Sequence, residues 1–153
     1  MKRLLICTML LITLALSAFS AGTSTIKKTQ VASMESPKEW IVLSIVWVAD
    51  TSHAFSDLTL SDTTYELDGY ELVGIETYPG GTAPTNGYVT AIKDALGVTI
   101  GTNTGSNTAG VISAGSYMIP VTGDLTFSIT GNSVNSATAT CKLFFARRVY
   151  PLS

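Results

Sequence analysis

Residues 40–49 read "WIVLSIVWVA", and this stretch decides the fold class of the chain. Val, Ile and Trp favour extended backbone because branched and aromatic side chains pack well on a pleated surface. Successive residues of a strand point to opposite faces, and apolar residues here occupy both alternating sets. The stretch therefore predicts a β-strand that is covered on both faces.

Short apolar segments separated by turn residues extend this prediction along the chain. The segment 125–130 alternates Leu, Phe and Ile with Thr and Ser, which indicates a half-buried strand. The segment 139–145 alternates in the same way, with one face formed by Ala139, Cys141, Leu143 and Phe145. We also expect strands at 58–60, 65–67, 70–78, 88–94, 98–101 and from Val111, and a mobile loop over 102–110.

About seven or eight antiparallel strands, with no amphipathic helix after the first 22 residues, predict an all-β fold. We expect a β-sandwich of jelly-roll or immunoglobulin-like type. Hydrophobic residues make up 46% and charged residues 13% of the 153 residues, and the charged share is far below the ~25% of an average soluble protein. This balance is typical of an extracellular or capsid-like domain.

The first 22 residues, "MKRLLICTMLLITLALSAFSAG", have the order of a secretory signal. Lys2 and Arg3 precede an uncharged apolar run from Leu4 to about Leu16, and small residues allow a cut after Ser20. An uncleaved membrane anchor is the alternative, although the run is short for the ~20 residues of a spanning helix. We expect contact with a membrane only through this leader, if it is retained.

Three parts are predicted: the leader at 1–22, a flexible arm at 23–39 and a β-sandwich domain at 40–153. The arm segment "TSTIKKTQVASMESPKE" is polar and has Pro37 near its end. A polar segment of this kind buries too little apolar surface to order by itself. We expect it to order on contact with a neighbouring protein.

The stretch "ETYPGGTAPTNGY" at 76–88 predicts a stiff polar loop between two strands. Its prolines fix φ and remove backbone donors, so strand pairing stops there, and its glycines permit turns with positive φ. Stiff loops flanked by aromatic residues can present a contact surface at low ordering cost; the alternative is that the loop only joins two sheets. The candidate interaction residues are Tyr78, Pro79, Thr82, Pro84, Thr85, Asn86 and Tyr88, with the two tyrosines expected to be exposed.

Two segments resemble small all-β proteins of tailed bacteriophages and prophages. Residues 76–98 carry a Pro-Gly-x-x-Ala-Pro-Thr loop, a Tyr-containing strand and an Asp-x-x-Gly turn, and residues 123–145 are similar to the closing hairpin of those proteins. The resemblance implies a compact β-domain that is a component of, or accessory to, a virus particle, without catalysis. The leader departs from this pattern, because virion proteins of such phages assemble in the cytoplasm.

The charge balance argues against nucleic acid as a partner. Without Lys2 and Arg3, seven basic residues remain against eleven acidic residues. Binding to a phosphate backbone needs neutralising Lys and Arg, and the pair Arg147–Arg148 is too small for such a surface. We expect protein partners, namely other virion or surface proteins, in several copies or as a homo-oligomer.

Residues with catalytic or metal-binding chemistry are few and scattered, so we expect no enzyme, metal or cofactor. His53 is the only histidine, with Asp50 or Asp57 as its possible orienting partner, and no Gly-x-Ser-x-Gly turn is present. The zinc ligand set of three or four Cys and His cannot be assembled. A solvated acidic rim is favoured over a calcium site for Asp57, Asp62, Glu66 and Asp68. Cys141 is expected to be a buried strand residue.

Two functions follow from the sequence. The first is a non-enzymatic virion protein, for example a capsid decoration protein, located in the virion. The alternative is an exported module in the periplasm, on the cell surface or secreted, which binds glycan or protein.

Overall fold

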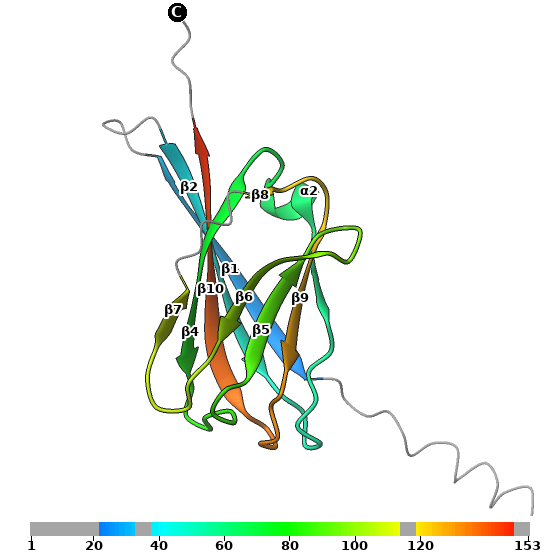
Figure 1. Ribbon diagram of the computed structural model, residues 1–153, viewed down its shortest axis with the longest axis vertical. Coiled ribbons are helices and arrows are strands. Elements are labelled where there is room, and N and C mark those ends of the chain that lie inside the picture. The colour runs from blue at the N-terminus through cyan, green and yellow to red at the C-terminus, as the bar shows by residue number, and fades with distance from the viewer. Residues whose placement is uncertain (1–21, 33–37, 114–118, 149–153) are drawn as a thin grey trace, which may run out of the picture.

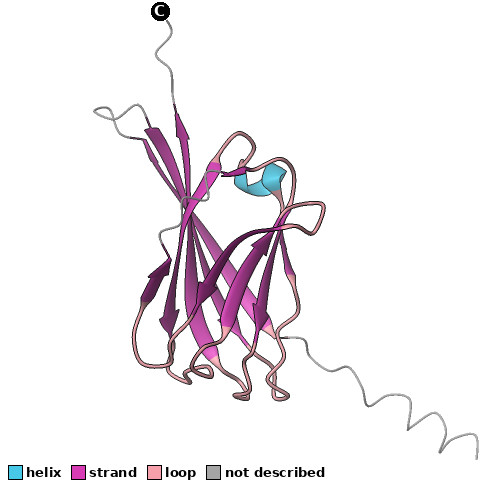
Figure 2. Ribbon diagram, viewed as in Figure 1, coloured by secondary structure: helices cyan, strands magenta, loops and turns pink. Residues whose placement is uncertain are grey.

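The computed structural model describes residues 22–32, 38–113 and 119–148, and these residues form a two-layer β-sandwich (Figures 1 and 2). Sheet A has six strands and sheet B has four. Sheet A contains β1 (Thr23–Ala32), β2 (Lys38–Val48), β4 (Glu71–Pro79), β7 (Val111–Ser113), β8 (Ile119–Pro120) and β10 (Thr138–Arg148). Sheet B contains β3 (Leu58–Leu60), β5 (Val89–Lys93), β6 (Thr99–Thr104) and β9 (Leu125–Thr130); the short helix α2 (Asp62–Tyr65) follows β3.

The strand order is that of a jelly roll. Sheet A runs β1-β2-β10-β4-β7, with β8 also paired to β4, and sheet B runs β3-β9-β5-β6. The first strand after β1 therefore pairs with the last, the next with the one before the last, and so on inward, all antiparallel. This nesting of strands is the double Greek key of a jelly roll. The predicted β-sandwich is confirmed, and the jelly-roll alternative is the one that the chain adopts.

The core lies between the inner faces of the two sheets, where the alternation of the sequence places it. On β10, Ala139, Cys141, Leu143 and Phe145 are all buried, as predicted. Aromatic rings fill the middle: the ring centroid of Phe55 lies 5.8 Å from that of Trp47 and 6.0 Å from that of Phe127. Each buried ring removes a large apolar surface from water, which is the main stabilising contribution in so small a domain.

One long side of the sandwich is closed by Asn103 of β6. Its Nδ2 atom donates to the carbonyl oxygens of Ile75 on β4 (3.0 Å) and Val111 on β7 (3.2 Å). Its Oδ1 atom accepts from the Thr77 hydroxyl at 3.2 Å. The buried Asn103 side chain thus joins sheet B to sheet A. Its donor and acceptor atoms both have hydrogen-bond partners, as buried polar groups require.

The flexible arm predicted over 23–39 is wrong for residues 23–32, which form β1, and for residues 38 and 39, which begin β2, whereas 33–37 lie outside the described residues. This strand pairs with β2 over its whole length, from Thr23 opposite Val48 to Ala32 opposite Glu39. Polarity misled the prediction, because an edge strand at the rim of a sheet keeps most of its side chains in water. Its register with β2 comes from backbone hydrogen bonds and from Ile26, which packs against the core.

Two other local predictions are wrong. Residues 65–67 do not form a strand: Ser61 caps the short helix α2 by accepting from the Thr64 amide, and Glu66 ends it in the left-handed conformation. The loop predicted over 102–110 begins only after Thr104, because residues 102–104 are the last part of β6 and pair with β5. The predicted leader lies outside the described residues, except for Gly22, which precedes β1.

Candidate interaction surface

The loop after β4 is tied to the start of β10 by backbone hydrogen bonds. The Gly80 amide donates to the Thr138 carbonyl at 2.7 Å, and the Thr138 amide donates to the Thr82 carbonyl at 2.7 Å. A Cβ atom on Gly80 would lie 2.7 Å from the Thr138 carbonyl oxygen. Only glycine permits this close approach of two backbones.

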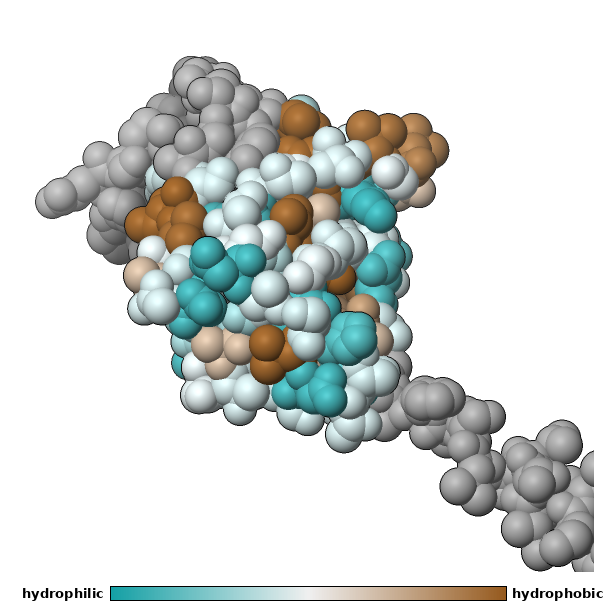
Figure 3. Space-filling view, turned by 60° about the horizontal axis from the view of Figure 1, so that its bottom comes forward, coloured by the Kyte–Doolittle hydropathy of each residue, from teal (hydrophilic) through white to brown (hydrophobic). Residues whose placement is uncertain are grey.

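Asn132 joins three loops at the same end of the sandwich. Its Oδ1 atom accepts from the Thr85 amide at 3.2 Å, and its Nδ2 atom donates to the His53 carbonyl at 3.1 Å. The Thr85 hydroxyl in turn accepts from the Ser133 amide at 2.8 Å. The loops that meet here lie at the lower end in Figure 1, and Figure 3, in which that end comes forward, shows mostly white residues of intermediate hydropathy with teal and brown residues among them. This loop end is therefore held in one conformation by its own hydrogen bonds.

The predicted interaction residues do not share one surface. Thr82 and Asn86 are exposed at the loop end, Pro79 and Thr85 are half-buried, and Pro84 is buried. Because β4 belongs to sheet A and β5 to sheet B, the loop crosses from one sheet to the other.

The expectation that Tyr88 is exposed is wrong. Its side chain is fully buried, and its ring lies edge-on to Trp47 with centroids 5.7 Å apart. The backbone at Gly105 packs so closely on this ring that an added Cβ would lie 2.7 Å from the hydroxyl oxygen. Burial raises the pKa of Tyr88. The alternation of β5 explains the error, because Tyr88 is in phase with the inward-facing Thr90 and Ile92.

Tyr78 is exposed, but on the outer face of sheet A. Its side chain is 37% exposed, its hydroxyl donates to Glu76 Oε1, and Lys142 Nζ lies 4.9 Å from its ring centroid. Lys142 also pairs with Glu76 at 3.4 Å. The hydrogen bond to Glu76 raises the pKa of Tyr78. These three side chains form the Tyr78 cluster, a preordered patch that combines an aromatic ring with a paired charge.

The rest of the outer face of sheet A is unusually apolar for a face turned to solvent. Trp40, Val42 and Phe144 are half-buried, Val46 is 44% exposed and Ile112 is 67% exposed. Antiparallel sheets with one solvated face normally carry polar residues there. The prediction that 40–49 is covered on both faces is met only on the inner face, because in the described part of the chain sheet B lies on that side alone. This surface was missed as a candidate site, although the two-faced apolar pattern of 40–49 was its signal.

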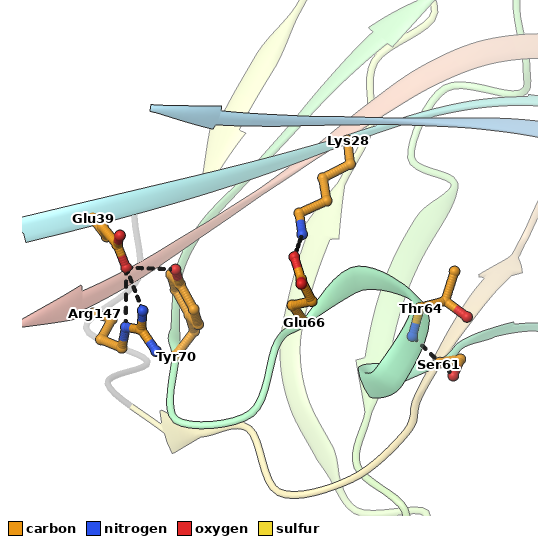
Figure 4. A network of polar contacts seen from close by, with 7 residues as sticks. All are labelled: Lys28, Glu39, Ser61, Thr64, Glu66, Tyr70 and Arg147. Atoms are coloured by element: carbon orange, nitrogen blue, oxygen red, sulfur yellow. Dashed lines mark hydrogen bonds and ion pairs between the residues drawn. The ribbon is translucent and has the colours of Figure 1, made fainter. Parts of the chain in front are cut away.

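Two ion pairs fasten the end of the sandwich opposite the loop end (Figure 4). Glu39 Oε2 accepts from Arg147 and, at 2.9 Å, from the Tyr70 hydroxyl, and Arg147 lies 4.7 Å from the Tyr70 ring centroid. Lys28 of β1 pairs with Glu66. Arg147 lowers the pKa of Glu39, and Lys28 lowers that of Glu66. These contacts join β1, β2 and β10 to the segment before β4.

Asp50 and His53, the residues considered for acid–base chemistry, lie in a hydrogen-bonded turn. One carboxylate oxygen of Asp50 accepts from the Ser52 amide, the Ser52 hydroxyl and the Ala54 amide, each at 2.8 Å. The Ser52 hydroxyl, above all, lowers the pKa of Asp50. His53 is exposed and has a left-handed backbone with φ of 63°. The Asp50 carboxylate therefore organises the backbone around His53.

The remaining reactive candidates are a buried thiol and carboxylates on the surface. Burial raises the pKa of the Cys141 thiol, so the thiolate nucleophile is disfavoured. Glu66 pairs with Lys28, and Asp57 and Asp68 are exposed. Among the residues that the structure describes, no three His, Cys, Asp or Glu side chains gather in a way that could hold a metal ion.

No family model matches this chain, and a search of curated proteins finds no match. Over the described ranges, no helix has the length and apolar character needed to cross a membrane.

Proposed function

We propose that this chain is a non-enzymatic structural protein, a virion-associated β-sandwich that decorates or joins other proteins of a phage or prophage particle. The observation that carries the proposal is the jelly-roll domain with an apolar outer sheet face and a preordered loop end. A fold by itself hosts many functions. Among these functions, the resemblance of residues 76–98 and 123–145 to proteins of tailed phages favours a role in a virus particle.

A structural role in many copies suits these surfaces. Repeated weak contacts on a symmetric lattice add up to high avidity without a large single interface. The loop end is ordered by the bonds of Asn132 and Thr138, so its loops lose little conformational freedom on contact. The partners proposed are therefore other virion proteins and further copies of this chain.

The test is the composition of purified particles. Particles are banded on a density gradient, and mass spectrometry measures the amount of this chain relative to the major capsid protein. A constant ratio across particle fractions, at many copies per particle, is the expected result. A control gradient of lysate from cells that produce no particles must leave the chain at the top. Absence of the chain from banded particles refutes the virion role.

A second candidate function is an exported module that binds glycan or protein, and the loop end favours it. Exposed Thr82 and Asn86 stand on a scaffold of hydrogen bonds between loops, and small neutral polar side chains on ordered loops suit adaptable hydrogen bonding. The intact mass of the protein from its native cells separates the two functions. A start near Ala21 indicates export and counts against assembly of virions in the cytoplasm.

A further inference from the structure

We propose that the outer face of sheet A is an interface between two copies of this chain, related by a two-fold axis that runs parallel to the strands between β2 and β10. The inference deepens the proposed structural role, since it names the surface by which copies meet, and it rests on that role's need for several copies. It is tested on purified protein without any particle. Failure of the pairing is therefore distinguishable from failure of the virion role.

The first argument is the apolar character of the face. Along β2, the outward positions carry Trp40, Val42 and Val46, and the neighbouring strand β10 adds Phe144. Aromatic residues are enriched at the buried centres of protein interfaces. Sheet B covers the other side of these strands, so within the described residues the sandwich does not cover this face itself.

The second argument is area. At about 3.3 Å per residue and about 4.8 Å between strands, the four long strands β1, β2, β10 and β4 present about 650 Å² in projection. The short strands β7 and β8 extend this surface. A standard interface covers about 800 Å² on each partner. The face is therefore of the size that a stable dimer needs.

The third argument is the strand register, which makes the face complementary to itself. Lys27, Ser44, Lys142 and Glu76 lie in one row across β1, β2, β10 and β4. A two-fold axis between β2 and β10, parallel to the strands, exchanges β1 with β4 and β2 with β10. It sets the exposed Lys27 of one copy over Glu76 of the other, and Ser44 over Lys142.

The neighbouring rows match in the same way. Val42 and Phe144 share a row, so the axis sets the valine of one copy over the phenylalanine of the other. Thr25 and Tyr78 are the end members of another row, so Thr25 meets the Tyr78 ring. An axis perpendicular to the strands that runs along the Lys27 row would instead stack Lys27 on its own copy, which like-charge repulsion disfavours. The parallel axis thus gives apolar and charged matches together.

The second copy is favoured over an unrelated partner because one surface satisfies both sides. In such an isologous contact every favourable pair occurs twice. Two sheets packed face to face in this way form two layers about 10 Å apart, as inside a β-sandwich. Within the Tyr78 cluster, Glu76 is only 8% exposed before contact, so its carboxylate loses little further hydration on pairing.

The test is sedimentation velocity of the full chain over a concentration series, with Val46→Glu as the disrupting variant. Wild-type protein is expected to sediment as a dimer at tens of micromolar. Because Val46 is 44% exposed, glutamate fits the monomer, and two buried carboxylates in the dimer are expected to weaken pairing by about 30-fold or more, the effect of losing a strong interface contact. Equal thermal melts at a concentration low enough for the wild type to be monomeric show that the variant monomer is folded, because dimerisation would otherwise raise the wild-type Tm.

Two further variants sharpen the result. Leu96→Glu is the matched control, because Leu96 is 90% exposed on the β5–β6 turn of sheet B, and its dimer is expected to equal that of the wild type. Lys27→Glu is expected to weaken pairing by up to about 5-fold, as for an exposed charge pair, and Lys93→Glu on sheet B is its control. A wild-type protein that stays monomeric at about 200 µM, well above the Kd expected of a standard-sized interface, or a dimer that Val46→Glu leaves intact, overturns the proposal.

Discussion

Gly80 and Gly81 are adjacent glycines with opposite surroundings, and substituting each by alanine tests how the loop after β4 is held. A Cβ on Gly80 would lie 2.7 Å from the Thr138 carbonyl oxygen and 2.9 Å from the Thr138 Cβ, whereas ordinary contacts begin at 3.4 Å. A Cβ on Gly81 meets no atom within 4 Å. Gly80→Ala must therefore push the loop away from β10, and Gly81→Ala need not move anything.

The expected loss follows from the bonds at this point. Separation breaks the Gly80–Thr138 and Thr138–Thr82 backbone hydrogen bonds, both 2.7 Å long, and each net bond contributes about 1 kcal/mol. With some strain that relaxation leaves behind, Gly80→Ala is expected to lower the free energy of unfolding by about 2–4 kcal/mol. Gly81→Ala is expected to be neutral or to stabilise by up to about 1 kcal/mol, because alanine restricts the unfolded chain.

Urea unfolding followed by tryptophan fluorescence measures both variants, and thermal melts give a second reading. At about 4 °C for each kcal/mol in a domain of this size, Gly80→Ala should lower Tm by about 8–16 °C. Equal stability of the two variants, or a Gly80→Ala variant within about 0.5 kcal/mol of wild type, the range of an ordinary surface substitution, would refute the reasoning. It would mean that the loop is not held against β10 by these bonds.

Three further predictions concern the acid response, the thiol and the core. In the folded state the pKa of Glu39 is lowered from its ordinary value of 4.5. The ionised Glu39 therefore stabilises the fold above pH 4.5, and this contribution is lost as the pH falls through the folded-state pKa. In acid titrations of unfolding, Glu39→Gln should lose less stability below about pH 4.5 than the wild type. Cys141 is buried, so a thiol reagent should leave it unmodified in native protein and react in urea; rapid native reaction would contradict its packing. Phe127→Ala should cost about 3–5 kcal/mol of unfolding free energy, because Phe127 is fully buried, whereas Leu96→Ala should change little.

Local pattern was sufficient for the strands that carry a strong alternation. The β9 and β10 faces, the edge strand β3 and the Asp94–Gly97 turn lie where the sequence predicts them. Each depends on short-range chemistry: period-two burial for the strands, and an Asp side chain that accepts the amides of Leu96 and Val98 in the turn. Such features need no knowledge of distant residues.

The errors fall where a distant partner decides the outcome. The polar residues 23–32 form a strand only because they pair with the edge of β2. Tyr88 is buried because Trp47 and Gly105 pack on its ring. The Tyr78 cluster likewise joins β4 to β10, with Tyr78 and Lys142 lying 64 residues apart in the chain. Propensity cannot report such neighbours, because they are brought together only when the sheets form.

The amino-acid sequence alone determined that this chain is an all-β protein with most of its strands and their inward faces, because side-chain alternation acts between adjacent residues. Tertiary structure decided the jelly-roll order, the strand β1 and the apolar outer face of sheet A on which Tyr78, Val46 and Phe144 lie. The physical reason is that strand pairing is set by backbone hydrogen bonds and burial between segments far apart in the chain, and the same residue types can satisfy many pairings until one of them encloses the core.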